Sequence, residues 1–510
     1  MRSVPKQRVR YGQLPVPAER ADLSWSKKQR ELVGITDGQL TRLIIDTPEF
    51  EEVITPMLDA IDRRNRTGYG NTMGRPSRFT SLHLESVLLY RRVAGLEQIK
   101  ETRERLQLDL EAQELLDLNG GLPSLKTMSR YMRERIEAAE RADLYRELDR
   151  RLRQRVCRLP GFDMEARIMG MDGSRQGTRY TPPIPEVNRK GEKTGRFVNG
   201  DKVQGMPGAI TAATAGYVGG HNPKSGKGWQ MVGLWSQHGT LLAWDVSPLN
   251  ESEMPAAERV LASYASEVLP HRHPQTISVL TADGGFSSNA IRAQAQAARM
   301  VPNIHNASHK IVPGTEDDQT ENASHRTRSW RVFKEPNRPH YSNWRANGHG
   351  ELACKCGEGK TKRVFEIGKT GLSIATKGCC STCGNVTITV GQWRSGGENW
   401  QHWVRCRRND QPDLTLGNSL TFNDPISREY GRDRYGYGES VHATLMHRFG
   451  LLDDKSWMRN LLEVQTEFAI AGAAISVLLL EREARRNATE TAVSLPPLSD
   501  EASGALPLAA

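Results

Sequence analysis

Residues 166–174 read "ARIMGMDGS" and residues 276–288 read "TISVLTADGGFSS", and in both an aspartate and a glycine follow a short apolar run. Apolar runs of this length that are bounded by Gly and Ser predict buried β-strands. A carboxylate just past a buried strand is held rigidly and still reaches solvent. The two segments therefore predict that Asp172 and Asp283 lie at the carboxyl edge of one sheet, where α/β folds place their functional sites.

The surrounding sequence predicts the rest of that sheet. "GWQMVGLWS" at residues 228–236 and "TLLAWDVSP" at residues 240–248 have the pattern of further strands, whereas residues 251–269 and 287–300 show helical spacing. Strands that first form a meander and then alternate with helices predict an α/β fold, a mixed sheet flanked by helices. Residues 161–304 are assigned to the first part of this core.

A third acidic residue, Glu439, stands far downstream in "RDRYGYGESVHATLMHRFG", residues 432–450, on a predicted helix. Residues 411–486 are assigned to the second part of the core. Three carboxylates brought together in this way can hold two divalent cations about 3.5–4 Å apart. Enzymes use that arrangement to break and join phosphodiester bonds, so the pattern favours a DNA-processing enzyme.

The charge of the whole chain is consistent with a polyanionic partner. The 510 residues carry a net charge of +10, and the first thirty hold eight Lys or Arg against Glu19 and Asp22. Residues 1–37 are predicted to form a basic flexible arm, which either follows phosphates or is simply a solvated leader. No secretory signal is evident, and the longest apolar run, residues 468–480, is shorter than the ~20 residues that span a bilayer. We expect a buried helix there and a cytoplasmic protein without a membrane partner.

Residues 38–160 are predicted to be helical and to bind DNA. Within them "NGGLPSLKTMSRYMRER", residues 119–135, contains a turn, a helix cap at Ser124 and a basic helix, which resembles a helix-turn-helix. The alternative is a basic helix whose charges only face solvent. At the other end, residues 487–510 have little to bury and predict a disordered tail.

Residues 305–410 are predicted to form a β-rich insertion with a zinc-ribbon-like cysteine cluster. "ACKCGEG" at residues 353–359 and "GCCSTCGN" at residues 378–385 place a glycine directly after two pairs of thiols. Thiolate pairs on tight turns suit a structural Zn²⁺ ion with four sulfur ligands, whereas reduced buried thiols would leave the pairing unexplained. The predicted ligands are Cys354, Cys356, Cys380 and Cys383. Cys379 is a possible substitute ligand, and Cys157 and Cys406 are expected to be ordinary core residues.

Over residues 60–486 the chain resembles the DDE transposases of bacterial insertion sequences, whose core is RNase-H-like and carries an insertion between the second Asp and the Glu. The resemblance is carried by "GMDGSRQGT", "LTADGGFSSNAI" and "YGRDRYGYGESVHATLMHRFGL". It implies that Asp172, Asp283 and Glu439 bind two Mg²⁺ ions per active site. The approach to Glu439 is spaced more loosely than in that family, and Glu463 is the competing third ligand.

The resemblance also implies DNA contacts. It assigns Arg434 and Tyr430 to DNA phosphate near the glutamate, and we add Arg175, which follows the first aspartate. Trp330, in the basic context "HRTRSWRVFK", is predicted to stack on an unpaired base or, alternatively, to pack within the insertion.

The implied function is a transposase that cleaves DNA at transposon ends and joins those ends to target DNA, with Mg²⁺ as cofactor. Its expected partners are double-stranded DNA, as transposon ends and target, and a second copy of the chain in a DNA-bound homodimer. It would act in the bacterial cytoplasm at the nucleoid. The alternatives are a structure-specific RNase-H-like nuclease, which cuts without joining, and a catalytically silent or domesticated DNA-binding relative.

Overall fold

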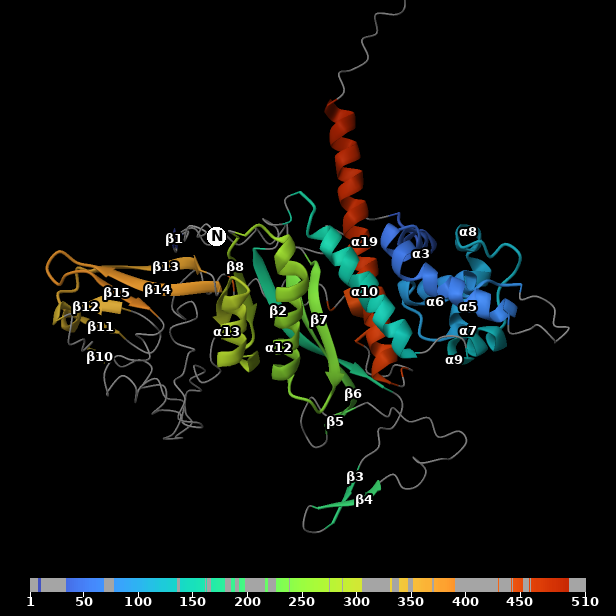
Figure 1. The fold of residues 1–510 in the computed structure, drawn as a ribbon, viewed down its shortest axis with the longest axis horizontal. Coiled ribbons are helices and arrows are strands. Elements are labelled where there is room, and N and C mark those ends of the chain that lie inside the picture. Colours follow the sequence, from blue (N-terminus) through green and yellow to red (C-terminus); the bar gives the residue numbers. More distant parts are fainter. Residues whose placement is uncertain are drawn as a thin grey trace, which may run out of the picture.

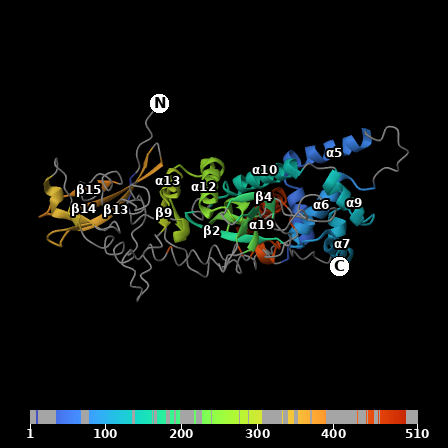
Figure 2. The ribbon, with the colours of Figure 1, turned by 90° about the horizontal axis from the view of Figure 1, so that it is seen from below.

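The computed structural model is elongated, and a central sheet separates a helical region at one end from a β-rich insertion at the other (Figures 1 and 2). The structure describes residues 8–10, 34–67, 78–134, 138–160, 162, 167–178, 185–188, 192–197, 216–218, 226–237, 239–274, 276–286, 288–304, 331–332, 339–346, 352–368, 371–389, 430, 442, 444–452, 458 and 460–494.

Helices make up most of the described part of residues 34–160. Its helices are α3 (Asp37–Ile45), α4 (Pro48–Val53), α5 (Thr55–Thr67), α6 (Ser81–Val93), α7 (Ile99–Leu108), α8 (Leu110–Leu115), α9 (Leu125–Glu134) and α10 (Ala138–Val156). Side-chain caps begin several of them, because the first N–H groups of a helix have no partner within the helix. Ser124 confirms its predicted role, since its Oγ accepts a hydrogen bond of 3.1 Å from the N–H of Thr127 at the start of α9.

The central sheet is mixed, as predicted. Its strands are β2 (Ile168–Gly177), β5 (Gly216–Val218), β6 (Gly226–Ser236), β7 (Leu241–Pro248), β8 (Ser278–Ala282) and β9 (Met300–Ile304). β7, β6 and β2 form an antiparallel meander, after which β8 lies parallel to β2 and β9 lies parallel to β8. The short β5 pairs with the first residues of β6. A separate two-stranded hairpin joins β3 (Pro185–Val187) and β4 (Lys193–Phe197).

Helices cover both faces of the sheet. α12 (Glu253–Ser263) and α13 (Asn289–Ala297) follow β7 and β8 in the chain and pack on one face (Figure 1). α10 and α19 (Leu461–Ser494) cover the other face over β7, where the Trp244 ring lies 6.2 Å from that of Phe468. Trp244 Nε1 also donates a 2.9 Å hydrogen bond to Asp149 of α10.

The helical region and the second part of the core share one hydrophobic core. Glu467 of α19 is fully buried and forms ion pairs with Arg91 and Arg92 at the end of α6. Arg92 also donates a hydrogen bond to the carbonyl of Phe449. Residues 38–160 therefore pack against the core through buried charges of α6 and α19 that neutralise one another at this junction.

The helix α19 differs from its prediction in length. Its segment Leu461–Asn487 is long and apolar enough to cross a bilayer, with a mean hydropathy of 1.5, but 78% of the most apolar window is buried inside the protein. Core helices share these features, and burial supports the predicted buried helix. The helix also continues to Ser494, although a tail is predicted from residue 487, and Arg485 pairs with Glu481 one turn before that point.

The insertion contains two small antiparallel sheets. One joins β10 (Arg331–Val332), β11 (Trp344–Ala346) and β12 (Leu352–Cys354), and the other joins β13 (Lys360–Gly368), β14 (Gly371–Cys379) and β15 (Val386–Thr389). β1 (Arg8–Arg10) adds to the free edge of β13, so part of the predicted flexible arm is a strand. Tyr341 and Trp344 form a second core with the cysteines, separate from the main one.

Candidate active site and metal centre

Asp172 and Asp283 lie side by side on neighbouring strands. The last registered pair of β2 and β8 is Met171 with Ala282, and each aspartate is the next residue of its chain. Because parallel strands are about 4.8 Å apart, the two carboxylates are brought to one place at the carboxyl edge of the sheet. Asp283 is exposed and opens the turn Gly284–Phe286, as its sequence predicts. Asp172 is half-buried within β2 and not past its end, because β6 pairs with β2 as far as Gly177.

The face of the sheet that carries Asp172 follows from strand register. Side chains alternate along a strand, and register partners share a face. Asp172 shares its face with its register partner Gly233. The next residue, Gly173, faces the other side of the sheet. A Cβ at Gly173 would meet Glu253 of α12, which places α12 on the far face. Asp172 therefore points away from α12, toward the face that α10 and α19 cover over β7.

Trp235 lines this face beside the aspartates. Trp235 pairs with Gly170, and a Cβ at Gly233 would overlap its indole ring. The two glycines thus let the indole lie flat over β2 and β6. His442 packs against this fully buried indole in a T-shaped contact with ring centroids 4.9 Å apart. His442, three residues after Glu439 in the sequence, thereby lies near Gly170, two residues along β2 from Asp172.

Hydrogen bonds from N–H groups one or two residues further along the chain orient both aspartates. Asp172 Oδ1 accepts from the N–H of Gly173 at 2.9 Å, and Asp283 Oδ1 accepts from the N–H of Gly285 at 3.1 Å. Such local bonds hold an aspartate side chain against its own turn or strand. Two rigid carboxylates at one edge supply the oxygen ligands that Mg²⁺ prefers. The donor set fits a divalent cation, although two residues alone do not complete a site.

The other residues predicted for the active site fall into three groups. Glu439, Arg434 and Trp330 lie outside the described residues. Tyr430 is fully buried, so its side chain does not face solvent as a contact to DNA phosphate requires. Arg175 is half-buried and, by register with Gln230, lies on the α12 face and not on the face of Asp172. The parity of the strand decides this, because residues 172 and 175 differ by an odd number.

The competing ligand Glu463 belongs to a different environment. Its N–H donates to Asn460 Oδ1 at the start of α19, and its carboxylate lies close enough to raise the pKa of Arg91, which burial otherwise lowers. Glu463 is thus part of the charged junction between α6 and α19.

The four predicted zinc ligands come together. The sulfur atoms of Cys354, Cys356, Cys380 and Cys383 all lie within 4.8 Å of one another, and Cys356 Sγ is 3.3 Å from both Cys354 Sγ and Cys380 Sγ. A tetrahedral Zn²⁺ with bonds of about 2.3 Å needs sulfurs about 3.8 Å apart, which is close to this arrangement. The cluster confirms the prediction that these cysteines can hold zinc, and no open position is left for chemistry.

The turns of the cluster explain its glycines. Gly357 and Gly384 follow the second cysteine of each pair with φ of +82° and +81°, a left-handed conformation that other residues rarely adopt. These turns direct N–H groups at sulfur: Gly359 donates to Cys354 Sγ at 3.0 Å, and Cys383 donates to Cys380 Sγ at 3.3 Å. Burial raises the pKa of Cys354, but the bonds from Cys356 and Gly359 lower it to about 7. Cys379 is exposed at the end of β14 and is not part of the cluster.

The sequence does not reveal the Trp235–His442 contact, although Gly170 and Gly233, each next to an apolar residue in a predicted strand, are a usable signal of close packing.

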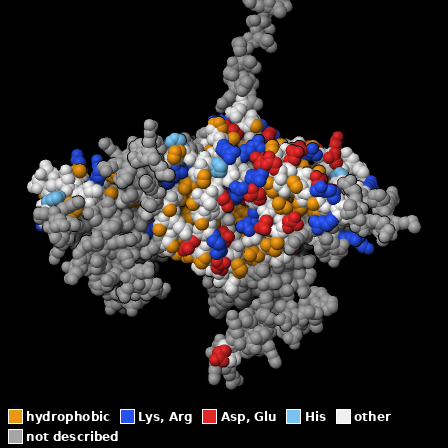
Figure 3. Space-filling view, in the orientation of Figure 1, with side chains coloured by type: hydrophobic (Ala, Val, Ile, Leu, Met, Phe, Trp, Pro, Cys, Tyr) orange, Lys and Arg blue, Asp and Glu red, His pale blue; other side chains and the backbone are white. Residues whose placement is uncertain are grey.

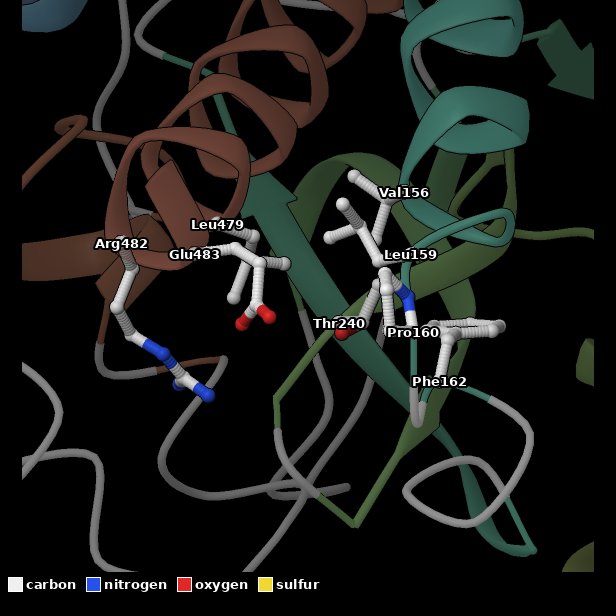
Figure 4. Close-up of a pocket in the computed structure, with 8 residues that line it drawn as sticks. All are labelled: Val156, Leu159, Pro160, Phe162, Thr240, Leu479, Arg482 and Glu483. Carbon is white, nitrogen blue, oxygen red and sulfur yellow. The ribbon is translucent and has the colours of Figure 1, made fainter. Parts of the chain in front are cut away.

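A small pocket lies between the end of α10, the β6–β7 turn at Thr240 and α19 at Leu479 (Figure 4). This pocket is at the opposite end of β2 from Asp172, because the N–H of Gln237 beside the turn bonds the carbonyl of Ile168. It is not part of the candidate active site.

No protein-family model and no curated protein matches this chain. Among solved structures, it is similar to the one described as "Crystal structure of the Mos1 mariner paired end complex with Mn", at 14% identity over 56% of this chain and 78% of that chain, with a TM-score of 0.16. A TM-score this low supports no conclusion about the fold or the function of this chain.

Proposed function

We propose that this protein is a DDE transposase with an RNase-H-like core, which cleaves DNA at transposon ends and joins those ends to target DNA. The observation that carries the proposal is the place of the two aspartates in the sheet. An antiparallel meander of three strands, extended by two parallel strands, is the arrangement of RNase-H-like cores. Asp172 lies on the first of these strands and Asp283 directly follows the fourth, next to each other.

Asp172 and Asp283 would hold Mg²⁺ together with Glu439. A bound pair of Mg²⁺ ions activates an attacking hydroxyl and stabilises the leaving oxygen of a phosphodiester. The protein's own contribution is to keep both carboxylates rigid through their strand and turn, with Asp283 exposed to solvent.

Chain connectivity supports Glu439 as the third ligand. Glu439 precedes His442 by three residues, which span at most about 11 Å of chain. His442 packs on Trp235, whose register partner Gly170 is two residues from Asp172, or about 6.6 Å along the strand. The anchored His442 therefore keeps Glu439 within reach of the aspartate pair.

The partners and location follow from this proposal. The net charge of +10 favours double-stranded DNA, and processing of two transposon ends in one complex favours a DNA-bound homodimer. We propose that the enzyme acts at the bacterial nucleoid.

The test compares Asp172→Asn and Asp283→Asn with the control Asp143→Asn, which changes an exposed carboxylate of α10. Changes around a metal ligand already cost about 10–100-fold, so we expect loss of a ligand to reduce Mg²⁺-dependent cleavage by more than about 100-fold. DNA binding should remain, and the control should cleave normally. The substrate is DNA carrying the inverted repeats that flank the gene, with a target plasmid and Mg²⁺.

The products separate the proposal from its alternatives. Cleaved and joined DNA supports a transposase, cleavage alone indicates a structure-specific nuclease, and binding alone indicates a silent relative. Normal cleavage by either active-site variant would contradict the assignment.

A further inference from the structure

Three lysines gather on one face of the four-stranded sheet of the insertion. Lys362 on β13 pairs directly with Lys377 on β14, and Lys360 lies two residues along β13 on the same face. Lys360 and Lys362 are exposed and Lys377 is half-buried. Within the part of the chain that the structure describes, these lysines form no ion pair. We call this surface the lysine face.

The lysine face points outward because the other face of the same sheet is covered. Phe365 and Ile374 share that other face and are fully buried. A Cβ at Gly378, also on that face, would overlap the ring of Trp344 from the small sheet β10–β12. Basic side chains are visible on the outer surface of this lobe (Figure 3). The three lysines are therefore on the opposite side of the sheet from Phe365, Ile374 and Trp344, and on their own side Val364, the next position along β13, is buried.

The N-terminal strand extends the same face. Its register places Arg8 opposite Glu366 and Arg10 opposite Val364, in the row of β13 positions that contains Lys360 and Lys362. By backbone register, β1 therefore extends the sheet beside the β13 row that contains Lys360 and Lys362.

The lysine pair is unfavourable for the sheet alone. Like charges directly opposite each other destabilise an antiparallel pair, so the pairing of Lys362 with Lys377 lowers the stability of the sheet. An anion between them removes the repulsion, and a row of cations about 6.6 Å apart along a strand suits a polyanion better than a small ion. We propose that the lysine face binds the phosphate backbone of double-stranded DNA. This inference rests on the proposed function, because it takes DNA as the protein's polyanion.

The experiment measures the salt dependence of DNA binding by the full-length protein. The probe is a short fluorescent double-stranded oligonucleotide of arbitrary sequence, and its dissociation constant is measured across a NaCl series. The variant is Lys360→Gln/Lys362→Gln/Lys377→Gln. The control, Lys355→Gln/Arg485→Gln/Arg486→Gln, removes the same charge from exposed positions outside both the lysine face and residues 38–160. Lys355 also lies between two zinc ligands and thus tests whether any nearby cation has the same effect.

Each phosphate contact contributes about 0.9 to the slope of log K against log[salt], so the face variant should lower that slope by about 2.7. The control should leave the slope unchanged. A second variant, Lys362→Glu, should raise the melting temperature by creating an opposite-charge pair with Lys377 and should weaken DNA binding.

Equal slopes for the face variant and the control would overturn the inference, and so would a wild-type protein that binds no DNA. These results are distinct from failure of the proposed function. If the lysine face binds DNA but the protein shows no Mg²⁺-dependent cleavage, the inference about the lysine face stands and the proposed transposase function is wrong.

Discussion

At the scale of single residues, two aspartates and two glycines shape the candidate active site. Asp172 and Asp283 are neighbours because each comes directly after a member of the last register pair of β2 and β8, Met171 and Ala282. Gly170 and Gly233 lack side chains, and so the indole of Trp235 can lie over the strands and meet His442. The contact between Trp235 and His442 thus depends on the lack of side chains at these two glycines.

Gly233→Ala should destabilise the protein by about 1–3 kcal/mol, because its methyl group would overlap the Trp235 ring in a closely packed site. Urea unfolding measures the change. Gly285→Ala is the matched control, since a Cβ there meets no atom within 4 Å, and its unfolding free energy should change by less than about 0.5 kcal/mol. Equal effects of the two substitutions would show that the indole is not packed as described.

At the scale of elements, the zinc-ribbon-like cluster is built from two tight turns that come from β12 and from the loop between β14 and β15. Each turn holds two thiols through backbone geometry, and pairing of β13 with β14 brings the turns together. Four thiols this close are stable as thiolates only around a cation, because like charges would otherwise repel.

We expect the purified protein to contain one zinc ion per chain, measured by elemental analysis. Cys383→Ser should lose that zinc and destabilise the insertion, because structural zinc contributes on the order of 10 kcal/mol of binding free energy. Cys379→Ser should keep the zinc, since Cys379 is exposed and outside the cluster. Zinc loss in the Cys379 variant with retention in the Cys383 variant would reverse the ligand assignment.

At the scale of the whole molecule, buried charges join the helical region to the core. Burial alone would raise the pKa of Glu467, but Arg91 and Arg92 lower it to about 2 from its ordinary value of 4.5. At Arg91 burial outweighs pairing and lowers the pKa of the guanidinium. The network couples the region predicted to bind DNA to α19 and to the segment near His442.

The lowered pKa of Glu467 predicts a loss of stability in acid. A carboxylate whose pKa is lower in the folded state stabilises that state fully above about pH 4.5, and this contribution disappears as the pH falls to about 2. The shift corresponds to about 3 kcal/mol, measurable by urea unfolding across this pH range.

Glu467→Gln should destabilise the protein by about 3–5 kcal/mol at neutral pH, because it leaves two buried arginines without a counter-charge. The variant should also have a flatter pH dependence between pH 4.5 and 2. The control Glu481→Gln, which removes a surface partner of Arg485, should keep the wild-type pH dependence. An unchanged pH profile in Glu467→Gln would show that this carboxylate is not charged in the folded protein.

The sequence by itself predicts the mixed α/β sheet, the paired aspartates and the cysteine cluster. These features depend on local patterns, namely apolar runs, turns and the glycines that permit them, which act over a few residues. Only the tertiary structure decides which face of β2 carries Asp172, that Tyr430 is buried, that Glu463 lies near Arg91, and that Lys362 opposes Lys377. The first and last of these facts depend on strand register, which a shift of one residue would change. The other two depend on contacts between segments far apart in the chain.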